Sequence, residues 1–330
     1  MTNEQNKRLK VAIIGLGNQT INDHIPSLLR RNDVVISVVC DIKKQALNLF
    51  SEKYPKLPKN VKKYMSFAKI PFSDSDIDFA ILSVPHDKYF EIIKVLVAKK
   101  IPFIKEKPFA RDIKEMKKIL SLPGIEKYCF VCSQRRYSPL YKKAAEVVKQ
   151  VGKPYLFRAC YELKIQDPHR GWRGSSLKAG GGCLIDMGYH IIDQLLWWFG
   201  EPEKIFVSKS NLAVPSVKQY AEDTAVISFK YDSGLQGSII LSRSTAEKRE
   251  EYELVGSKAQ INGNKRFLIL RDKNGNILLN LNNGEDTEMI DKQLDFFIKR
   301  VREKKDFSDI LSQHKTNMKF IDRCYREVSK

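Results

Sequence analysis

The 330-residue chain lacks any long hydrophobic run, and no stretch approaches the ~20 consecutive apolar residues that a membrane-spanning helix needs. Its first eight residues are polar and do not form the apolar core of a signal peptide. We therefore expect a cytoplasmic protein with no membrane partner. The length suffices for two domains, each with its own hydrophobic core.

Cysteine is scarce and scattered, with six residues and a single C-x-x-C pair, Cys129 and Cys132. This pair lies in a short apolar stretch that predicts a buried strand. Residues three apart on a strand point to opposite faces, which disfavours a redox or zinc pair. We expect reduced, mostly packed thiols and no metal site.

The chain also lacks an arginine-rich tail and any basic patch interleaved with aromatic residues, although its formal net charge is +19. Such a charge favours anionic partners: nucleic acid, a membrane surface, or a phosphorylated or carboxylated small molecule. The lysines are spread along the whole chain, so lysine-rich solvated faces explain the charge better than nucleic-acid binding. We expect no nucleic-acid partner, while an anionic small-molecule substrate remains open.

Strand-like and helix-like patterns alternate over the first 130 residues. Short, nearly all-apolar runs predict strands buried on both faces at 9–15, 34–40, 77–85, 102–105 and 128–132, with a weaker strand at 61–67. The alternation predicts an α/β fold with a doubly wound, Rossmann-type parallel sheet. Ligands of such sheets bind beyond the carboxyl ends of the strands.

The first apolar run leads into the sequence Gly15-Leu16-Gly17-Asn18-Gln19-Thr20, a version of the dinucleotide-binding fingerprint. Gly15 permits the tight turn, and Gly17 lets the backbone approach a pyrophosphate at the start of the next helix. The third glycine of the fingerprint is missing, because Thr20 stands in its place.

Asp41 follows the second predicted strand, where a carboxylate can accept hydrogen bonds from the adenosine ribose hydroxyls. It would repel the 2′-phosphate of NADP, although Lys43 or Lys44 could reach such a phosphate. The expected cofactor is NAD, with NADP as the alternative. Asp41 could also cap the helix that starts near Lys43, and it can do both.

The second half contains one stretch with acid–base character, residues 180–193. Three consecutive glycines permit a sharp turn, and an apolar helical pattern follows from Leu184 to Trp198. On one helix, Asp186, His190 and Asp193 would share a face. A carboxylate and an imidazole one turn apart suit acid–base catalysis. A helix that only pairs its own charges fits the pattern equally well.

The remainder of the second half predicts an α+β domain. A long loop at 164–179 offers polar and aromatic groups for substrate contacts, and we expect its His169 to be solvated. Strand-like runs from 204 to 270 predict a broad, largely antiparallel sheet, followed by helices at 293–304 and 315–328. We divide the chain into a dinucleotide-binding domain at 1–130 and a substrate-binding and oligomerisation domain at 131–330.

Several motifs together resemble the Gfo/Idh/MocA family of nicotinamide-dependent sugar and polyol oxidoreductases, over nearly the full length. In chain order they are Gly15-Leu16-Gly17, Asp41, Ser83-Val84-Pro85, Glu106-Lys107-Pro108, Gln134-Arg135-Arg136-Tyr137, the glycine stretch with Asp186, Gly188, His190 and Asp193, and Glu222-Asp223-Thr224-Ala225. Their shared order and spacing carry the resemblance.

The resemblance implies hydride transfer between a nicotinamide and a secondary alcohol or ketone of a sugar, sugar acid or nucleotide sugar. Lys107 resembles the family's lysine at the nicotinamide ribose and the reacting hydroxyl. His190 resembles its general acid/base, and Asp186 the carboxylate one turn earlier. Trp172 and Arg173 fall where many members contact substrate. Arg136 is near the same site by analogy, although a structural arginine is an equal interpretation.

The cofactor contacts implied by the resemblance are Gly15, Leu16, Gly17, Asn18, Gln19, Asp41, Ser83, Val84, Pro85, His86, Glu106, Lys107 and Gln134. A large sheet covered by helices on one face must also cover its other face. The family does this by pairing sheets between subunits, which implies a homodimer or homotetramer.

A few positions depart from the family pattern. Thr20 replaces a glycine, and His24 comes one position later than the usual histidine. His86 and Tyr89 stand where asparagine and histidine are more usual, and Gln134 stands in place of an asparagine. The alternative function is a non-catalytic regulator or scaffold on the same fold, since fold does not fix function. The presence of Lys107, Asp186 and His190 together favours the enzyme.

Overall fold

The computed structural model describes residues 7–58, 60–72, 77–167, 169–213, 221–282 and 288–327. The chain forms two compact units, each built from segments far apart in the sequence. The first spans residues 1–110, 114–132 and 290–313, and the second spans residues 111–113, 133–289 and 314–330. Residues 290–313, which the sequence-based division assigns to the second domain, therefore belong to the first unit.

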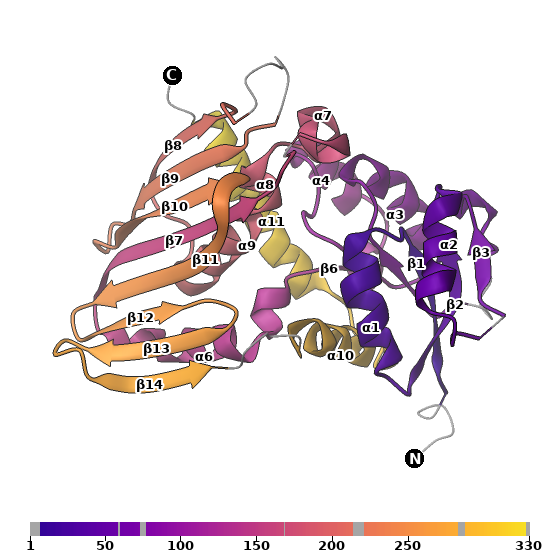
Figure 1. Cartoon of the computed structure of the whole chain (residues 1–330), viewed down its shortest axis with the longest axis horizontal. Coiled ribbons are helices and arrows are strands. Elements are labelled where there is room, and N and C mark those ends of the chain that lie inside the picture. The colour runs from indigo at the N-terminus through magenta and orange to yellow at the C-terminus, as the bar shows by residue number, and fades with distance from the viewer. Residues whose placement is uncertain are drawn as a thin grey trace. The chain divides into compact units, whose positions relative to one another are not determined.

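A six-stranded parallel sheet forms the centre of the first unit (Figure 1). Its strands, in spatial order, are β3 (Lys62–Tyr64), β2 (Val34–Cys40), β1 (Leu9–Ile14), β4 (Phe79–Leu82), β5 (Phe103–Lys105) and β6 (Cys129–Val131). The chain runs outward from β1 to β3 and then returns to β4, so the strand order switches between β1 and β4. The predicted doubly wound sheet is confirmed, and such switch points are where ligands bind.

Helices surround this sheet: α1 (Ile25–Leu29), α2 (Lys44–Lys53), α3 (Tyr89–Ala98), α4 (Ile113–Leu120), α5 (Ile125–Tyr128) and α10 (Glu288–Arg302). The late helix α10 joins the unit through a cluster of aromatic rings. Phe297 lies 5.4 Å from Phe79 and 5.6 Å from Phe130, between ring centroids, and Phe307 lies 5.7 Å from Phe130. Burial of a phenylalanine stabilises a fold by about 1.5–3 kcal/mol, which accounts for the return of the chain to the first sheet.

The helix after β1 begins as a π-helical turn over Thr20–His24 and continues as α1. Pro26 has no backbone N–H, so one hydrogen bond of a regular α-helix is lost at this point. A π turn holds one residue more than an α turn. His24 is the last residue of this turn.

The second unit contains an eight-stranded sheet in which every neighbouring pair is antiparallel except β7 with β10. In spatial order the strands are β14 (Ile277–Asn282), β13 (Phe267–Asp272), β12 (Ala259–Gly263), β11 (Ser244–Gly256), β7 (Pro154–Lys164), β10 (Gln236–Ser242), β9 (Thr224–Lys230) and β8 (Lys204–Ser210). The expected large, mostly antiparallel sheet is confirmed.

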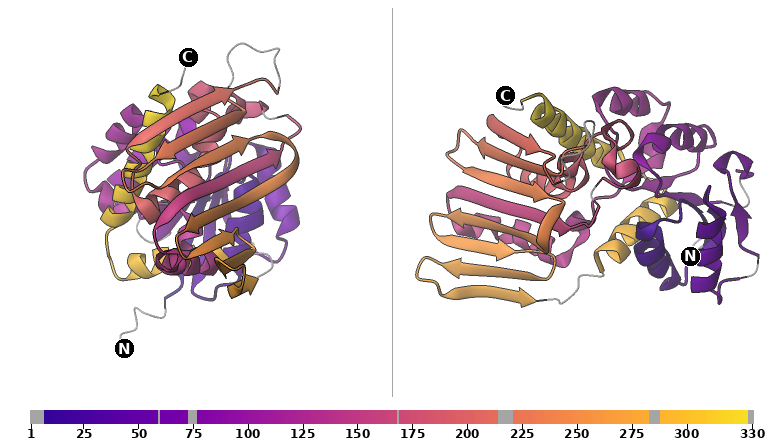
Figure 2. Two further views of the ribbon diagram at one scale, coloured as in Figure 1. Left: turned by 90° about the vertical axis from the view of Figure 1, so that its left-hand side faces the viewer. Right: turned by 45° about the horizontal axis from the view of Figure 1, so that its top comes forward.

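Helices of the second unit cover one face of this sheet (Figure 2). They are α6 (Pro139–Val147), α8 (Cys183–Asp186), α9 (Gly188–Phe199) and α11 (Ser308–Arg326), while the short α7 (Ser176–Ala179) lies in the segment before α8. Phe157 of β7 is fully buried against the rings of Trp198 and Phe199 in α9. The opposite face exposes apolar side chains, among them Phe206 at 57% and Ile240 at 41%.

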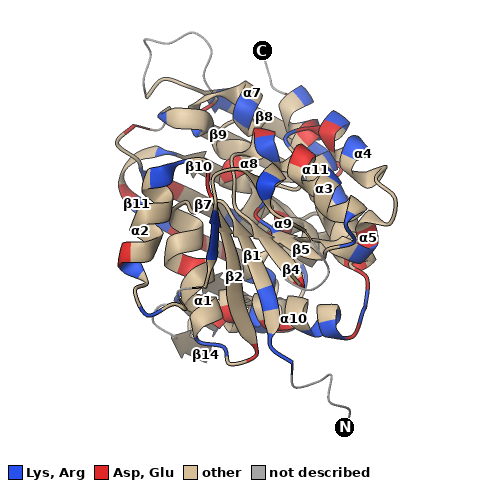
Figure 3. Ribbon diagram, turned by 90° about the vertical axis from the view of Figure 1, so that its right-hand side faces the viewer, with Lys and Arg blue, Asp and Glu red and all other residues tan. Residues whose placement is uncertain are grey.

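All six cysteines are free and buried, as expected. No helix within the described ranges is both long enough and apolar enough to cross a bilayer. Lys and Arg lie on many elements and are mixed with Asp and Glu (Figure 3).

Candidate active site

The fingerprint loop lies at the switch point between β1 and β4. Gly15 has a φ of +96°, and a Cβ there would lie 2.1 Å from the carbonyl oxygen of Ser83, so only glycine fits. A Cβ on Gly17 would meet no atom within 4 Å. Thr20 donates a hydrogen bond from Oγ1 to the Gly15 carbonyl at 2.7 Å, which closes the turn without the third glycine. The space at Gly17 is the opening that a pyrophosphate would need.

Asp41 ties the fingerprint loop to the end of β2. Its carboxylate accepts hydrogen bonds from the backbone N–H of Leu16 at 2.9 Å and of Lys43 at 2.8 Å. The second bond forms a turn just ahead of α2 rather than a cap on its first helical turn. Each carboxylate oxygen keeps a further lone pair, so Asp41 can still accept from ribose hydroxyls.

The other predicted cofactor residues of the first unit also follow the carboxyl ends of its strands. Residues 83–85 come directly after β4, and the Ser83 N–H bonds the Ile14 carbonyl at 2.9 Å. His86 is buried at the start of a short 3₁₀ helix. Glu106 and Lys107 follow β5, and the Glu106 N–H bonds the Leu82 carbonyl at 3.0 Å. Asn18 is exposed at the start of the first helix, and Gln19 is half-buried there.

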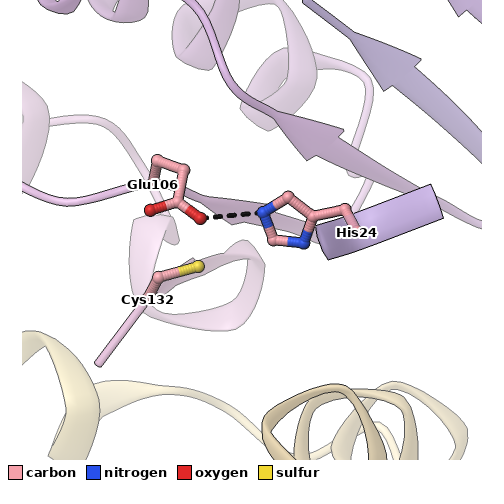
Figure 4. Close-up of side chains that lie close together, drawn as sticks. All are labelled: His24, Glu106 and Cys132. Carbon is pink, nitrogen blue, oxygen red and sulfur yellow. Dashed lines mark hydrogen bonds and ion pairs between the residues drawn. The ribbon is translucent and has the colours of Figure 1, made fainter. Parts of the chain in front are cut away.

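Glu106 is buried in a polar cluster with His24 and Cys132 (Figure 4). The His24 Nε2 atom lies 2.8 Å from the Glu106 Oε1 atom. Burial opposes ionisation of Glu106, but His24, Lys107 and the Cys132 thiol hold its pKa below the usual range. The Gln293 amide also contacts the Cys132 Sγ atom at 3.4 Å.

These three side chains are the one group within the described ranges whose donor atoms lie close enough to share a metal ion, all within 4.8 Å. Their mutual hydrogen bonds already account for the arrangement. We therefore interpret the cluster as the support that fixes Glu106, and through it the start of the segment that carries Lys107.

The glycine stretch of the second unit packs against protein. A Cβ on Gly182 would lie 1.9 Å from the Glu222 carbonyl oxygen. Glycine at this position therefore allows the backbone of residue 222 to pack closely against it. The Glu222 carboxylate then caps α8 by accepting from the N–H groups of Gly182 at 2.9 Å and Leu184 at 3.1 Å. The glycine and the glutamate together fix where α8 begins.

Asp186 is held by two arginines. The predicted helix is interrupted at Met187, so Asp186 ends α8 and His190 lies in the first turn of α9. The Asp186 Oδ2 atom lies 3.1 Å from Nη2 of Arg243 and 3.4 Å from Nε of Arg173. The Arg243 side chain is only 1% exposed. Sequence reasoning missed Arg243, because nothing in the sequence distinguishes it from other arginines beside strands.

His190 is half-buried next to Tyr161 of β7, with 6.4 Å between the ring centroids. Burial raises the pKa of Tyr161 to about 12, so its hydroxyl stays protonated near neutral pH. Asp193 is paired bidentately with Arg136 at 2.9 Å and also accepts from Asn317. These bonds favour the structural interpretation of Arg136.

Trp172 and Arg173 lie in a 3₁₀ helix over Gly171–Gly174. The Arg173 guanidinium stacks over the Trp172 ring at 4.4 Å, while 55% of the Arg173 side chain stays exposed. The structure thus brings Trp172, Arg173 and Asp186 together in the second unit. Gln134 is buried in another 3₁₀ helix.

The expectation of a solvated His169 is wrong. His169 is buried, and its Nε2 atom lies 3.8 Å from the Asp223 carboxylate. The loop folds back on itself at Gly174, where a Cβ would lie 1.9 Å from the His169 carbonyl oxygen. A polar loop composition does not reveal such a close return.

Comparison with known proteins places the chain in a family. Residues 9–124 match the model of an oxidoreductase family with an NAD-binding Rossmann fold, and residues 141–262 match the GFO/IDH/MocA C-terminal domain. The rhizopine catabolism protein MocA of Rhizobium meliloti is 23% identical over 241 residues, which are 72% of each chain.

Solved structures show the same fold. An oxidoreductase from Thermotoga maritima superposes with a TM-score of 0.82 at 20% identity and covers 97% of both chains. The WlbA dehydrogenase from Chromobacterium violaceum, in complex with NADH and UDP-GlcNAcA, superposes with a TM-score of 0.76 at 19% identity, over 97% of this chain and 94% of that one. The chain belongs to the Gfo/Idh/MocA family and is an NAD(P)-dependent oxidoreductase that acts on CH–OH groups.

Proposed function

We propose that the protein transfers a hydride between NAD and a secondary alcohol or ketone of a sugar, sugar acid or nucleotide sugar. The observation that carries the proposal is the Asp186 carboxylate, which a fully buried arginine holds four residues before His190. A buried charged pair is costly to maintain for stability alone. Together with His190 and with Lys107, which follows β5, this carboxylate supplies the groups that alcohol oxidation requires.

The first unit has the features that NAD needs. The open space at Gly17 suits the pyrophosphate, and the Asp41 carboxylate suits the ribose hydroxyls. Residues 83–86, Glu106 and Lys107 would complete the cofactor contacts of this unit, and we propose Gln134, a residue of the second unit, as a further contact. When bound, the nicotinamide accepts or donates the hydride.

In the proposed mechanism His190 takes the proton of the substrate hydroxyl, and it returns that proton in the reverse direction. The Lys107 ammonium donates a hydrogen bond to the same oxygen and offsets the negative charge that develops there. Asp186, which Arg173 and Arg243 hold, accepts a hydrogen bond from the substrate. We propose that these three residues act together on one substrate.

An anionic sugar is the substrate class we favour. The chain carries a net charge of +19, and the half-exposed Arg173 stacks on Trp172 with donors left for an anionic group. The WlbA dehydrogenase, of the same fold, was solved with a nucleotide sugar acid. Hydride transfer to NAD with a panel of neutral sugars, sugar acids and nucleotide sugars tests the proposal. Activity on none of them, in either direction, would contradict it.

Asp41→Ala is expected to weaken NADH binding about tenfold, because it removes charge-assisted hydrogen bonds that are each worth about 1.5–3 kcal/mol, partly replaced by water. NADPH binding should fall less, since the repulsion of its 2′-phosphate is also removed. Fluorescence titration with each nucleotide measures both effects. Lys44→Ala serves as the control for NADH binding, and equal losses for both nucleotides would argue against a ribose-binding role.

We also propose that a second copy of the chain covers the open face of the large sheet. Phe206 and Ile240 lie on this face, because they pair across β9 with Ser228 and Val226, two residues apart on that strand. We expect the mass of a dimer or tetramer in sedimentation equilibrium. The double variant Phe206→Glu/Ile240→Glu should shift it toward the monomer, whereas Leu212→Glu, at another exposed apolar residue, should not. A monomeric wild-type protein at working concentrations would exclude this assembly.

A further inference from the structure

Lys105, the last residue of β5, is a fully buried lysine that the proposed mechanism does not use. The other residues of this strand, Phe103 and Ile104, are apolar and fully buried. A lysine at such a position is unusual, because burial of an ammonium group is costly unless its donors are satisfied. The contacts of its Nζ atom show how these donors are satisfied.

Three backbone carbonyls surround this ammonium. The Nζ atom donates hydrogen bonds to the carbonyl oxygens of Glu106 at 2.7 Å, Phe109 at 3.3 Å, and Pro108. A protonated lysine has three N–H donors and no acceptor, so the three carbonyls match its donors one to one. All three belong to the short segment that follows β5.

The face of an aromatic ring adds to this environment. Nζ lies 4.0 Å from the centre of the Tyr89 ring, at the start of α3. A cation this close to an aromatic face is attracted by the ring electrons, and the attraction is stronger when both groups are desolvated. Tyr89 stands where the family resemblance leads us to expect histidine, and here its ring faces the Lys105 ammonium.

The charge state follows from burial. Desolvation lowers the pKa of Lys105 to about 8, although nearby Cys129, Glu115, Cys132 and Glu106 act to raise it. Among the described residues, these four side chains and Tyr89 are the titratable groups near the ammonium, and they come from β6 and the residue after it, α4, α3 and the segment after β5. Lys105 is therefore mostly protonated near neutral pH, with all three donors present.

Lys107 lies inside the segment that these bonds hold. We propose that Lys105 is a positioning residue, whose ammonium fixes the backbone on both sides of Lys107 and so sets where the Lys107 side chain is presented. The functional part of this inference rests on the proposed role of Lys107. The geometric part concerns residues 105–109 alone and can be tested without a substrate.

The first test compares Lys105→Met with the wild-type protein. Methionine keeps the length of the side chain and removes all three donors. We expect hydrogen exchange in peptides covering residues 106–110 to be at least tenfold faster in the variant, with exchange in β1 and β2 unchanged. Lys99→Met, at an exposed lysine beyond α3, is the matched control. Unchanged exchange at 106–110 in folded Lys105→Met would overturn the proposal.

The second test does not depend on whether Lys105→Met folds. Tyr89→Leu removes the ring face but leaves Lys105 in place, whereas Tyr89→Phe keeps the face. In protein labelled with ¹³C at lysine Cε, we expect the titration of Lys105 to shift to lower pH in Tyr89→Leu and to stay near its wild-type midpoint in Tyr89→Phe. Exchange at 106–110 should rise only in Tyr89→Leu. Identical titration and exchange in both variants would overturn the proposal.

The pH dependence gives a third readout. Above the pKa of about 8 the neutral amine has two donors, so one carbonyl bond is lost and the protection of residues 106–110 should fall. Between pH 8 and the ordinary lysine pKa of about 10.4, the unfolded chain binds more protons at this residue than the folded chain. Lys105 therefore contributes a rise in the free energy of unfolding with pH over this window. Lys105→Met should lack both effects, and their persistence in the variant would count against the proposal.

Nicotinamide binding separates this inference from the proposed function. If wild-type protein does not bind NADH but Lys105→Met shows the faster exchange, the proposed function fails and the positioning role of Lys105 stands. If wild-type protein binds NADH and turns over a substrate, Lys105→Met should lower kcat at least tenfold while the KM for NADH changes less than threefold. An unchanged kcat would overturn the functional part.

Discussion

Replacement of His190 with alanine is expected to lower turnover by about 10²–10⁴-fold, the usual contribution of a general acid or base. The expected loss is in kcat, because the imidazole acts on the proton of the reacting hydroxyl. NADH affinity should stay within a few fold, since the predicted cofactor contacts lie on other residues. Single-turnover rates of nicotinamide oxidation or reduction, measured by absorbance, give the chemical step directly.

The companion variant Lys107→Met should lower turnover by about 10²–10³-fold through loss of electrostatic stabilisation of the reacting oxygen. Lys178→Met, at an exposed lysine of α7, is the control for removal of a positive charge. Thermal unfolding should leave His190→Ala close to wild type, because the ring is only half-buried. Rates near the wild-type value in both His190→Ala and Lys107→Met would remove the mechanism.

The first sheet was predictable because local patterns determine it. Each strand of a parallel sheet is buried on both faces and reads as a short apolar run, so the runs at 9–15, 34–40 and 77–85 could hardly form anything else. Gly15 could also be predicted from the local motif, because its positive φ admits little but glycine. Asp41 was placed correctly at the end of β2, but its bond to the Leu16 N–H was not foreseen.

Contacts between distant segments were beyond such reasoning. Arg243 pairs with Asp186 across 57 positions, and Glu222 caps α8 from 38 positions away. The sequence contains many arginines and glutamates, and nothing in the local sequence distinguishes Arg243 or Glu222 from the others. Residues 290–313 show the same limit. The sequence predicts helices at 293–304 and 315–328, whereas α10 spans Glu288–Arg302 and α11 begins at Ser308. The place of residues 290–313 in the first unit depends on the rings of Phe79 and Phe130.

Two polar residues, Lys105 and His169, have buried side chains that their local sequence does not predict. Lys105 ends a run of buried residues, and its place beside the Glu106-Lys107-Pro108 motif gives no sign that its own side chain is buried. His169 was assigned to solvent on the composition of its loop and is buried. In both cases the side chain meets groups supplied by the backbone or by remote carboxylates, and a single sequence does not reveal these.

Arg243→Met is expected to destabilise the protein by about 3–5 kcal/mol, the usual result of removing one partner of a buried ion pair. The guanidinium is almost fully buried and bonds both the Asp186 carboxylate and the Arg173 carbonyl. Without it, the buried Asp186 loses its shorter arginine contact and keeps the longer one with Arg173. Chemical denaturation at neutral pH measures the loss, and turnover should fall as well because Asp186 is no longer fixed.

A double-mutant cycle separates the ion pair from the packing of the arginine stem. Arg243→Met/Asp186→Leu removes both charges, so we expect it to recover part of the stability lost in Arg243→Met, because apolar replacement of a buried pair is often close to neutral. Arg173→Met, at the half-exposed partner, should cost less than about 1 kcal/mol. A loss below about 1 kcal/mol in Arg243→Met, or purely additive losses in the double variant, would show that the pair does not hold Asp186. Other contacts would then position Asp186. The main observation that supports its catalytic role would be lost.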